Sequence, residues 1–171
     1  MACDAGAGCA GFRGPGGVSA RLLFLDFDGV MHPSGCTVDR YFCQLGLLEA
    51  WLGQRPDVDI VVSSSWREHH PLGEIQSYFS PEIATRVIDV TPVLKPDSWT
   101  LRDGELPQEC FEREAEVKRW LHANNAHGTR WAALDDQASL FKPRNPHLVL
   151  CDGRIGLTQR ALDEIEKIFQ A

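Results

Sequence analysis

The stretch that decides the fold is Leu23-Phe24-Leu25-Asp26-Phe27-Asp28-Gly29-Val30, which is apolar up to two closely spaced aspartates. An apolar run of this kind, starting at Arg21, is typical of a parallel strand buried on both faces. Gly29 permits a tight turn after the strand, so Asp26 and Asp28 can point toward one cavity. Like charges so close together are costly unless a cation lies between them. Oxygen ligands of this type suit Mg²⁺.

Strands and helices alternate along the rest of the chain. Apolar runs predict strands at 21–26, 58–62, 86–90, 129–134 and 147–151, and helical periodicity predicts helices at 41–52, 112–124 and 158–169. The segment 66–79 is expected to be helical in pieces because Pro71 interrupts it, and 91–110 is expected to be a long loop. Alternation of this kind indicates parallel strands joined by right-handed crossovers. The sequence therefore predicts an α/β fold, a doubly wound, Rossmann-like, mostly parallel five-stranded sheet with helices on both faces.

Polar side chains follow three of the predicted strands. The residues at these strand ends are Asp26 with Asp28, Ser63 with Ser64, and Asp135 with Asp136. In doubly wound sheets the ligand site lies outside the carboxyl ends of the strands. We therefore expect these side chains to form one site.

Composition places the chain among ordinary globular proteins. Hydrophobic residues make up 43% and charged residues 24% of the 171 residues, and no apolar run approaches the length of a membrane span. The predicted organisation is a flexible Gly/Ala-rich leader over 1–20 and a single domain over 21–171. The net charge of -7 argues against a nonspecific nucleic-acid binder. It does not exclude a nucleic-acid substrate, because a bound cation and a few Arg residues can reverse the potential locally.

The cysteines show no metal-site or disulfide pattern. None forms a C-x-x-C pair or clusters with His at zinc-like spacing. They are Cys3, Cys9, Cys36, Cys43, Cys110 and Cys151. We interpret them as reduced thiols of a cytoplasmic protein, several of them buried.

Three motifs together resemble the haloacid dehalogenase-like (HAD) superfamily of aspartate-dependent phosphohydrolases. The stretch 23–30 resembles its first motif, Ile60-Val61-Val62-Ser63-Ser64-Ser65-Trp66-Arg67 its second, and Trp131-Ala132-Ala133-Leu134-Asp135-Asp136 its fourth. Order and spacing agree over about residues 20 to 165. The details of the second and fourth motifs look most like the small HAD domains found alone or in nucleic-acid repair proteins.

The resemblance implies a Mg²⁺-dependent phosphatase. Asp26 would attack phosphorus and form an aspartyl-phosphate. Asp28 would act as general acid and then general base, and its presence favours phosphatase over the ATPases and dehalogenases of the superfamily. The metal would take a carboxylate oxygen of Asp26, the backbone carbonyl of Asp28, and Asp136, with Asp135 as the alternative ligand.

The resemblance also implies residues that hold the phosphate. Ser64, or Ser63 as the alternative, would hydrogen-bond the phosphoryl group. The third motif requires a cation near the start of the helix over 112–124. Arg113 has that place, whereas Lys118 lies deeper in the helix, on the solvent side, and Lys95 lies in the long loop. Neighbouring residues are also expected to contact substrate: Gly29, Ser65 and Arg67.

Aromatic and histidine side chains near the site are not expected to take part in catalysis. Trp66 follows a strand directly, where a tryptophan usually packs, although it could stack on a base. His32 and His69-His70 have no carboxylate partner in view and are expected to be solvated.

The spacing of the motifs leaves no room for a substantial cap domain. Only about a dozen residues separate the aspartate pair from the next helix, and 91–110 is expected to be a loop. An open site favours the phosphate of a large substrate, such as a nucleic-acid end or a phosphoprotein. Two alternatives remain: phosphotransfer to an acceptor other than water, and a catalytically silent binding domain. The oligomeric state stays open.

Overall fold

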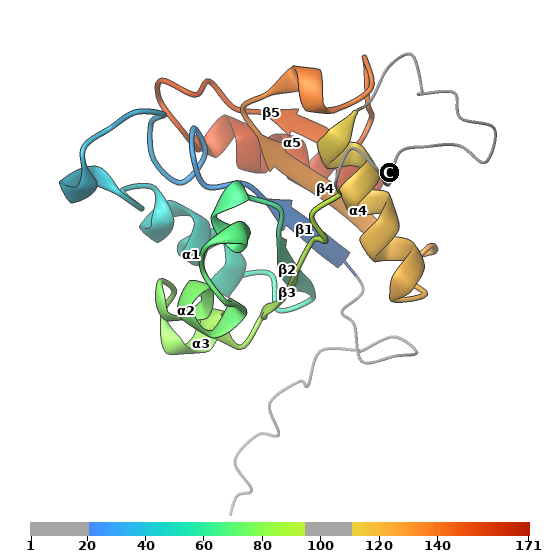
Figure 1. Ribbon diagram of the computed structural model, residues 1–171, viewed down its shortest axis with the longest axis horizontal. Helices are drawn as coiled ribbons and strands as arrows, with labels where there is room; N and C mark the ends of the chain where they lie inside the picture. The colour runs from blue at the N-terminus through green and yellow to red at the C-terminus, as the bar shows by residue number, and fades with distance from the viewer. Residues whose placement is uncertain (1–20, 95–110) are drawn as a thin grey trace, which may run out of the picture.

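The computed structural model shows one sheet of five parallel strands, in the order β3-β2-β1-β4-β5 (Figure 1). The strands are β1 Arg21–Leu25, β2 Val58–Val62, β3 Val87–Val90, β4 Arg130–Asp135 and β5 Leu148–Leu150. The structure describes residues 21–94 and 111–171. The predicted leader over 1–20 and most of the predicted loop over 91–110 therefore lie outside the described residues.

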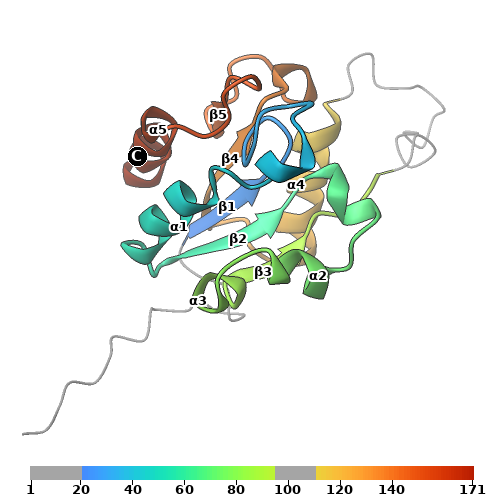
Figure 2. The same ribbon diagram turned by 90° about the vertical axis from the view of Figure 1, so that its left-hand side faces the viewer.

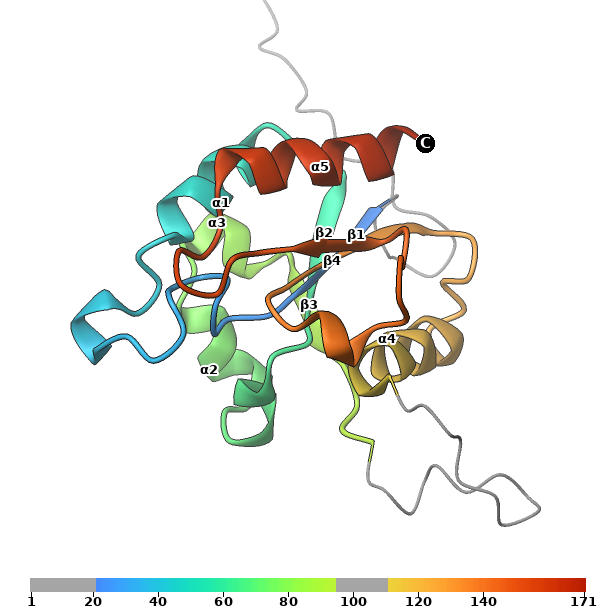
Figure 3. The same cartoon turned by 90° about the horizontal axis from the view of Figure 1, so that it is seen from above.

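The helices form two layers on the sheet (Figures 2 and 3). The α-helices are α1 Leu45–Gly53, α2 Leu72–Ser77, α3 Pro81–Ala84, α4 Glu112–Ala123 and α5 Gln159–Gln170. Short 3-10 helices are η1 Val38–Arg40, η2 Ser65–Glu68 and η4 Ala138–Leu140. Seen from above, α1 and α5 lie on one side of the sheet and α4 on the other. The predicted doubly wound α/β fold is confirmed.

Strand β1 connects two separate cores because alternate side chains point to opposite faces. Leu23 and Leu25 pack in the core under α1 and α5. Leu22 and Phe24 pack in the second core under α4. All four are fully buried, which explains why the run has no polar residue.

The strand register brings the three polar strand ends together. Leu25 of β1 is paired with Val62 of β2 and with Leu134 of β4. The residues that follow are Asp26, Ser63 and Asp135, so they lie side by side at the carboxyl edge. Backbone hydrogen bonds continue past the strands, from Asp26 N to Leu134 O and from Ser63 N to Leu25 O.

The helix predicted over 41–52 starts later than expected. The structure begins α1 at Leu45, and Phe42 has a φ of 57°, outside the helical region. The segment between β1 and α1 holds only η1, so this insertion point carries no cap domain. The segment 66–79 is helical in pieces as predicted, with Pro71 at the N-cap of α2.

Two further expectations concern cysteines and membranes. Cys36, Cys43 and Cys151 are free thiols, and the other three cysteines lie outside the described residues. Across 21–94 and 111–171, none of the helices has the length and apolar character needed to cross a bilayer.

Phe24→Ala should destabilise the fold strongly, because the Phe24 ring packs edge-on against Trp120 and Trp131 with both centroids 5.7 Å away. Removing a buried phenyl ring costs about 3–5 kcal/mol, which corresponds to a fall in Tm of roughly 10 °C for a chain of this size. Thermal unfolding followed by circular dichroism measures it. Val38→Ala, at an exposed position, should leave Tm within about 1 °C.

Candidate active site

Three carboxylates converge at the carboxyl edge of the sheet. Oxygens of Asp26, Asp135 and Asp136 all lie within 4.8 Å of one another. Asp26 and Asp135 are buried and Asp136 is half-buried. So much negative charge in so small a volume is unfavourable without cations nearby.

Two glycines make room for Asp136. A Cβ on Gly29 would lie 2.1 Å from Asp136 Oδ2, and one on Gly153 would lie 2.4 Å from the same oxygen. Gly29 also has a φ of 70°, which favours glycine. Ser34 Oγ donates a hydrogen bond of 3.0 Å to Asp136 Oδ2 and closes this cradle. Gly29, predicted to contact substrate, therefore has a clear structural role beside Asp136.

Among the described residues, Arg113 is the cation that reaches this cluster. Its Nη1 lies 3.5 Å from Asp26 Oδ1 and 3.3 Å from Asp135 Oδ2, and its side chain is 9% exposed. Nη1 is buried and makes no hydrogen bond to any described residue. Lys118, the alternative, is 56% exposed and pairs with Glu114 instead. Lys95 lies outside the described residues.

Burial dominates the acid–base properties of the buried pair. It raises the pKa of Asp26, against the opposing effects of Arg113 and of a hydrogen bond from Ser64. Burial, reinforced by the charge of Asp26, raises the pKa of Asp135 to about 7. Both shifts show that, with Arg113 as its cation, the site does not easily hold two negative charges on Asp26 and Asp135.

The donor set fits a hard divalent cation. Asp135 Oδ2 and Asp136 Oδ1 are buried and have no hydrogen-bond partner among the described residues. Asp135 Oδ1 accepts from Gln137 N, and its Oδ2 lies beside Arg113, whereas Asp136 Oδ1 stays open. This arrangement favours Asp136 over Asp135 as a Mg²⁺ ligand beside Asp26.

Asp28 is held apart from the cluster by two donors that the sequence interpretation missed. Trp66 Nε1 donates to Asp28 Oδ2 at 2.9 Å, and His32 Nε2 lies 3.1 Å from Asp28 Oδ1. Phe42 N donates to His32 Nδ1, so the Nε2 atom carries the proton that faces Asp28. The Asp28 side chain is 46% exposed, so solvent and substrate can reach it.

The expectation of solvated histidines is wrong for His32 and His70. His32 is fully buried because its ring stacks on Tyr41, with centroids 4.6 Å apart, and its two nitrogens have partners. His70 pairs with Glu74 at 2.7 Å and stacks on Trp66. Of these three histidines, only His69 is exposed. The four-residue spacing of Asp28 and His32 is the one sequence signal that could have indicated the first pair.

The serines after β2 differ in their surroundings. Ser63 and Ser64 are buried, and Ser65 is exposed. The Ser64 side chain hydrogen-bonds Asp26 and caps η2. This contact places the Ser64 hydroxyl at the predicted nucleophile.

Arg67, predicted to contact substrate, is directed into the protein. Its guanidinium donates to Ser63 O and Ser64 O at 2.7 Å each, and to Thr91 O at 3.0 Å. It also pairs with Glu116 at 2.6 Å and is only 3% exposed. These bonds fix the end of β2, which leaves Arg67 a positioning role.

Glu116 joins the two arginines. Besides its bond to Arg67, its carboxylate lies 3.7 Å from Arg113 Nε. Burial raises the pKa of Glu116, and the two guanidinium groups oppose that shift. The strand end at Ser64 and the first turn of α4 are therefore held in one buried network.

Comparison with known proteins places the chain in a family. A family model described as the HAD domain in Swiss Army Knife RNA repair proteins matches residues 22–162. No curated protein and no solved structure matched the chain.

Without a divalent cation, stability contributed by this site should fall as pH rises from about 4 toward 7. The folded chain keeps a proton on Asp135, whose pKa is about 7, that the unfolded chain releases. Mg²⁺ offsets the charge, so near saturation it should raise Tm by roughly 8 °C at pH 7.5 and far less at pH 5. Differential scanning fluorimetry measures both effects.

Asp136→Asn should remove most of this Mg²⁺ effect. Asp163→Asn is the matched control, because Asp163 is exposed on α5, away from the site. A wild-type Tm that does not respond to Mg²⁺ at pH 7.5 would contradict the metal site.

Proposed function

Since this chain belongs to the family of HAD domains in Swiss Army Knife RNA repair proteins, which supports a phosphatase or phosphotransferase type of activity, we propose that it is a Mg²⁺-dependent phosphomonoesterase. The observation that carries the proposal is the meeting of Asp26, Arg113 and Asp136 at the sheet edge, while Asp28 stands outside this cluster and is open to solvent. When bound, Mg²⁺ would be held by Asp26, Asp136 and the Asp28 carbonyl, and would offset negative charge on the phosphate.

Asp26 is the proposed nucleophile. Its Oδ1 accepts a hydrogen bond from Phe27 N at 2.9 Å, which fixes the carboxylate. An Asp26 oxygen would form a bond to phosphorus while the bond from phosphorus to the ester oxygen breaks, which gives an aspartyl-phosphate. A water oxygen then attacks phosphorus, and phosphate leaves with Asp26 restored.

Asp28 is the proposed acid and base. It would give a proton to the departing ester oxygen and take one from the attacking water. Its two oxygens are held by Trp66 and His32, so the carboxylate cannot turn away. Each oxygen keeps a second lone pair for the proton.

Arg113 and Ser64 are the proposed phosphate holders. Arg113 Nη1 is buried without a hydrogen-bond acceptor at normal distance, so it can donate to a phosphoryl oxygen. The Ser64 hydroxyl, already at Asp26, can donate to another. Ser63 and the exposed Ser65 remain secondary candidates.

A nucleic-acid end is the proposed substrate class, ahead of a phosphoprotein. The family description names RNA repair proteins. In residues 29–44, only η1 stands between the aspartates and α1, so this side of the site has no lid domain.

Transfer of the phosphoryl group to an acceptor other than water would use the same residues. It would differ from hydrolysis only in the molecule that attacks the aspartyl-phosphate.

Asp26→Asn should abolish hydrolysis of a generic aryl phosphate, by roughly 10³-fold or more, because the amide is not a nucleophile. Wild-type turnover should require Mg²⁺ and should leave an acid-stable, hydroxylamine-sensitive phosphoryl group on the protein in rapid quench. Asp163→Asn should keep wild-type rates. Full activity in Asp26→Asn would refute the covalent mechanism, and phosphate transferred to an added alcohol at the expense of water would identify a phosphotransferase.

Trp66→Phe should lower kcat roughly tenfold with little change in KM. The ring packing against Phe27 and Phe42 is largely kept, but the hydrogen bond to the Asp28 carboxylate is lost. Steady-state kinetics with an aryl phosphate measures the changes in kcat and KM separately. Trp51→Phe is the matched control, because it removes an indole bond to Glu166 far from the site. An equal loss of kcat in both variants would show that Trp66 acts only through stability.

A further inference from the structure

A groove of about 420 Å³ runs along the side of α4. One wall is the helix face that carries Glu114, Lys118 and Leu121, spaced by about one helical turn. The facing wall is the segment 142–147 before β5, and Trp131 of β4 also lines the groove. Figure 3 shows η4 lying beside α4 at this side of the sheet.

Both walls of this groove are close along the chain to residues of the site. Glu114 follows Arg113 directly in α4, and the facing segment is reached from Asp136 through η4. Glu114 holds the walls together, since its Oε2 accepts from Lys142 N at 2.8 Å and from Asn145 Nδ2 at 2.9 Å. The groove therefore lies next to Arg113 along α4, on the far side of the bridge that Glu114 makes between the two walls.

The charge of the groove is positive, on a chain of net charge -7. Its one carboxylate, Glu114, is already paired with Lys118 and is buried. Lys142 and Arg144 are exposed, and no described carboxylate pairs with either side chain. These two cations are therefore available to an anionic partner.

An aromatic pair adds a second feature that suits nucleic acid. The rings of Trp131 and His147 are stacked at 4.0 Å with an angle of 15°. Flat ring surfaces next to cations are what single-stranded nucleic acids use, through base stacking and phosphate contacts. Trp131 is buried and His147 is half-buried, so the imidazole is the part of this pair that a base can reach.

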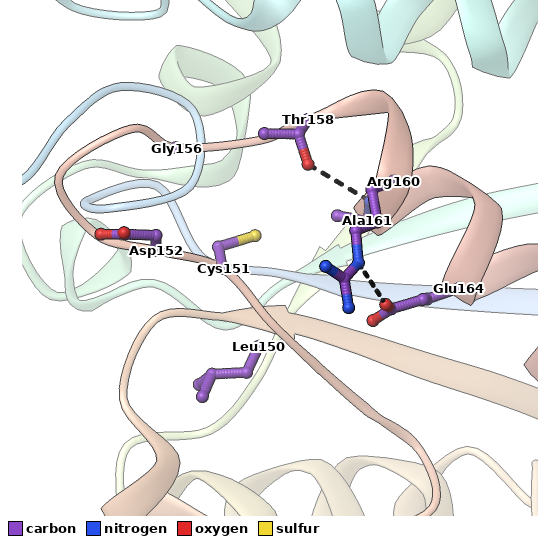
Figure 4. Close-up of a pocket in the computed structure, with 8 residues that line it drawn as sticks. All are labelled: Leu150, Cys151, Asp152, Gly156, Thr158, Arg160, Ala161 and Glu164. Atoms are coloured by element: carbon purple, nitrogen blue, oxygen red, sulfur yellow. Dashed lines mark hydrogen bonds and ion pairs between the residues drawn. The ribbon is translucent and has the colours of Figure 1, made fainter.

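A second pocket lacks these features. It lies beside the start of α5, with a volume of about 310 Å³ (Figure 4). Its Arg160 pairs with Glu164, and Asp152 at its rim pairs with Arg154. Burial raises the pKa of its Cys151 thiol to about 12, so the thiol is neutral. This pocket offers no unpaired cation from its own lining.

We propose that the groove along α4 binds a single strand of nucleic acid whose terminal phosphate lies at Asp26. Lys142 and Arg144 contact its backbone phosphates. From Arg113 to Leu121 the helix rises about 12 Å, the length of roughly three stacked nucleotides at about 3.4 Å each. The inference rests on the proposed function for its substrate class, and it adds the path of the strand and the residues that hold it.

The test is binding of single-stranded RNA of two or eight nucleotides, phosphorylated at the 5′ or the 3′ end. Fluorescence anisotropy is measured in an Asp26→Asn background, which prevents turnover. The charge reversal Lys142→Glu/Arg144→Glu should weaken binding of the eight-nucleotide strand at least about tenfold, because two phosphate contacts are lost. The slope of log affinity against log salt should shrink by about 1.4. Binding of the dinucleotide should change by less than about twofold.

The matched control is Arg160→Glu/Lys167→Glu, which makes the same change in net charge at two exposed positions of α5. It should bind the longer strand like the parent. An equal loss of affinity in the control would contradict the proposed strand path. So would equal affinities for the eight-nucleotide strand and the dinucleotide. A loss of affinity in Tyr41→Ala without one in the groove variant would also contradict the proposal, because the exposed Tyr41 ring, which stacks on His32, would then be the surface that binds the strand.

Aryl phosphate hydrolysis by the same variants in the wild-type background separates this inference from the proposed function. The groove variant should hydrolyse the small substrate at the wild-type rate, because neither Lys142 nor Arg144 contacts the carboxylate cluster. An inactive wild type would refute the phosphatase, whereas the binding data would still decide whether the groove holds the strand.

Discussion

The rest of the structure depends on the packing of three carboxylates against one guanidinium. Asp26, Asp135 and Asp136 place oxygens within 4.8 Å of one another, and Arg113 is the cation that reaches two of them. A cluster with this imbalance is unfavourable in a buried place, which is reflected in the raised pKa values of Asp26 and Asp135. A divalent cation and the arginine together would balance it. This unfavourable concentration of negative charge at the sheet edge is the feature on which the proposed metal site rests.

Several parts of the fold serve to hold this edge in place. The pairing of β1 with β2 and β4 puts the strand ends at the same level. Arg67 ties the end of β2 to Glu116, and Glu116 lies beside Arg113 in the first turn of α4. Because these groups are buried and hydrogen-bonded, a change in one moves the others. The cation therefore stands at a fixed place beside Asp26.

Asp28 belongs to a different environment from the cluster. It is half exposed, and an indole and an imidazole hold its two oxygens. This difference suits a group that exchanges protons with substrate and water, while the buried carboxylates suit bonding to phosphorus and metal. Next to Arg113 along α4, the proposed strand groove carries the opposite charge. One helix thus supplies both the cation of the site and a wall of the proposed strand path.

The sequence by itself determined the strands, their parallel pairing, and which acidic residues and serines stand at their ends, because burial on both faces leaves a mostly apolar run before each polar end, interrupted in β2 by Asp59. It also indicated Arg113, from its place at the start of a helix. Only the tertiary structure decided that Arg67 points inward, that Trp66 and His32 hold Asp28, and that Gly153 makes room for Asp136. These contacts join residues from separate elements, such as Asp28 with Trp66. When two contacting residues are far apart in the sequence, the direction of their side chains depends on tertiary packing, which the local sequence does not encode.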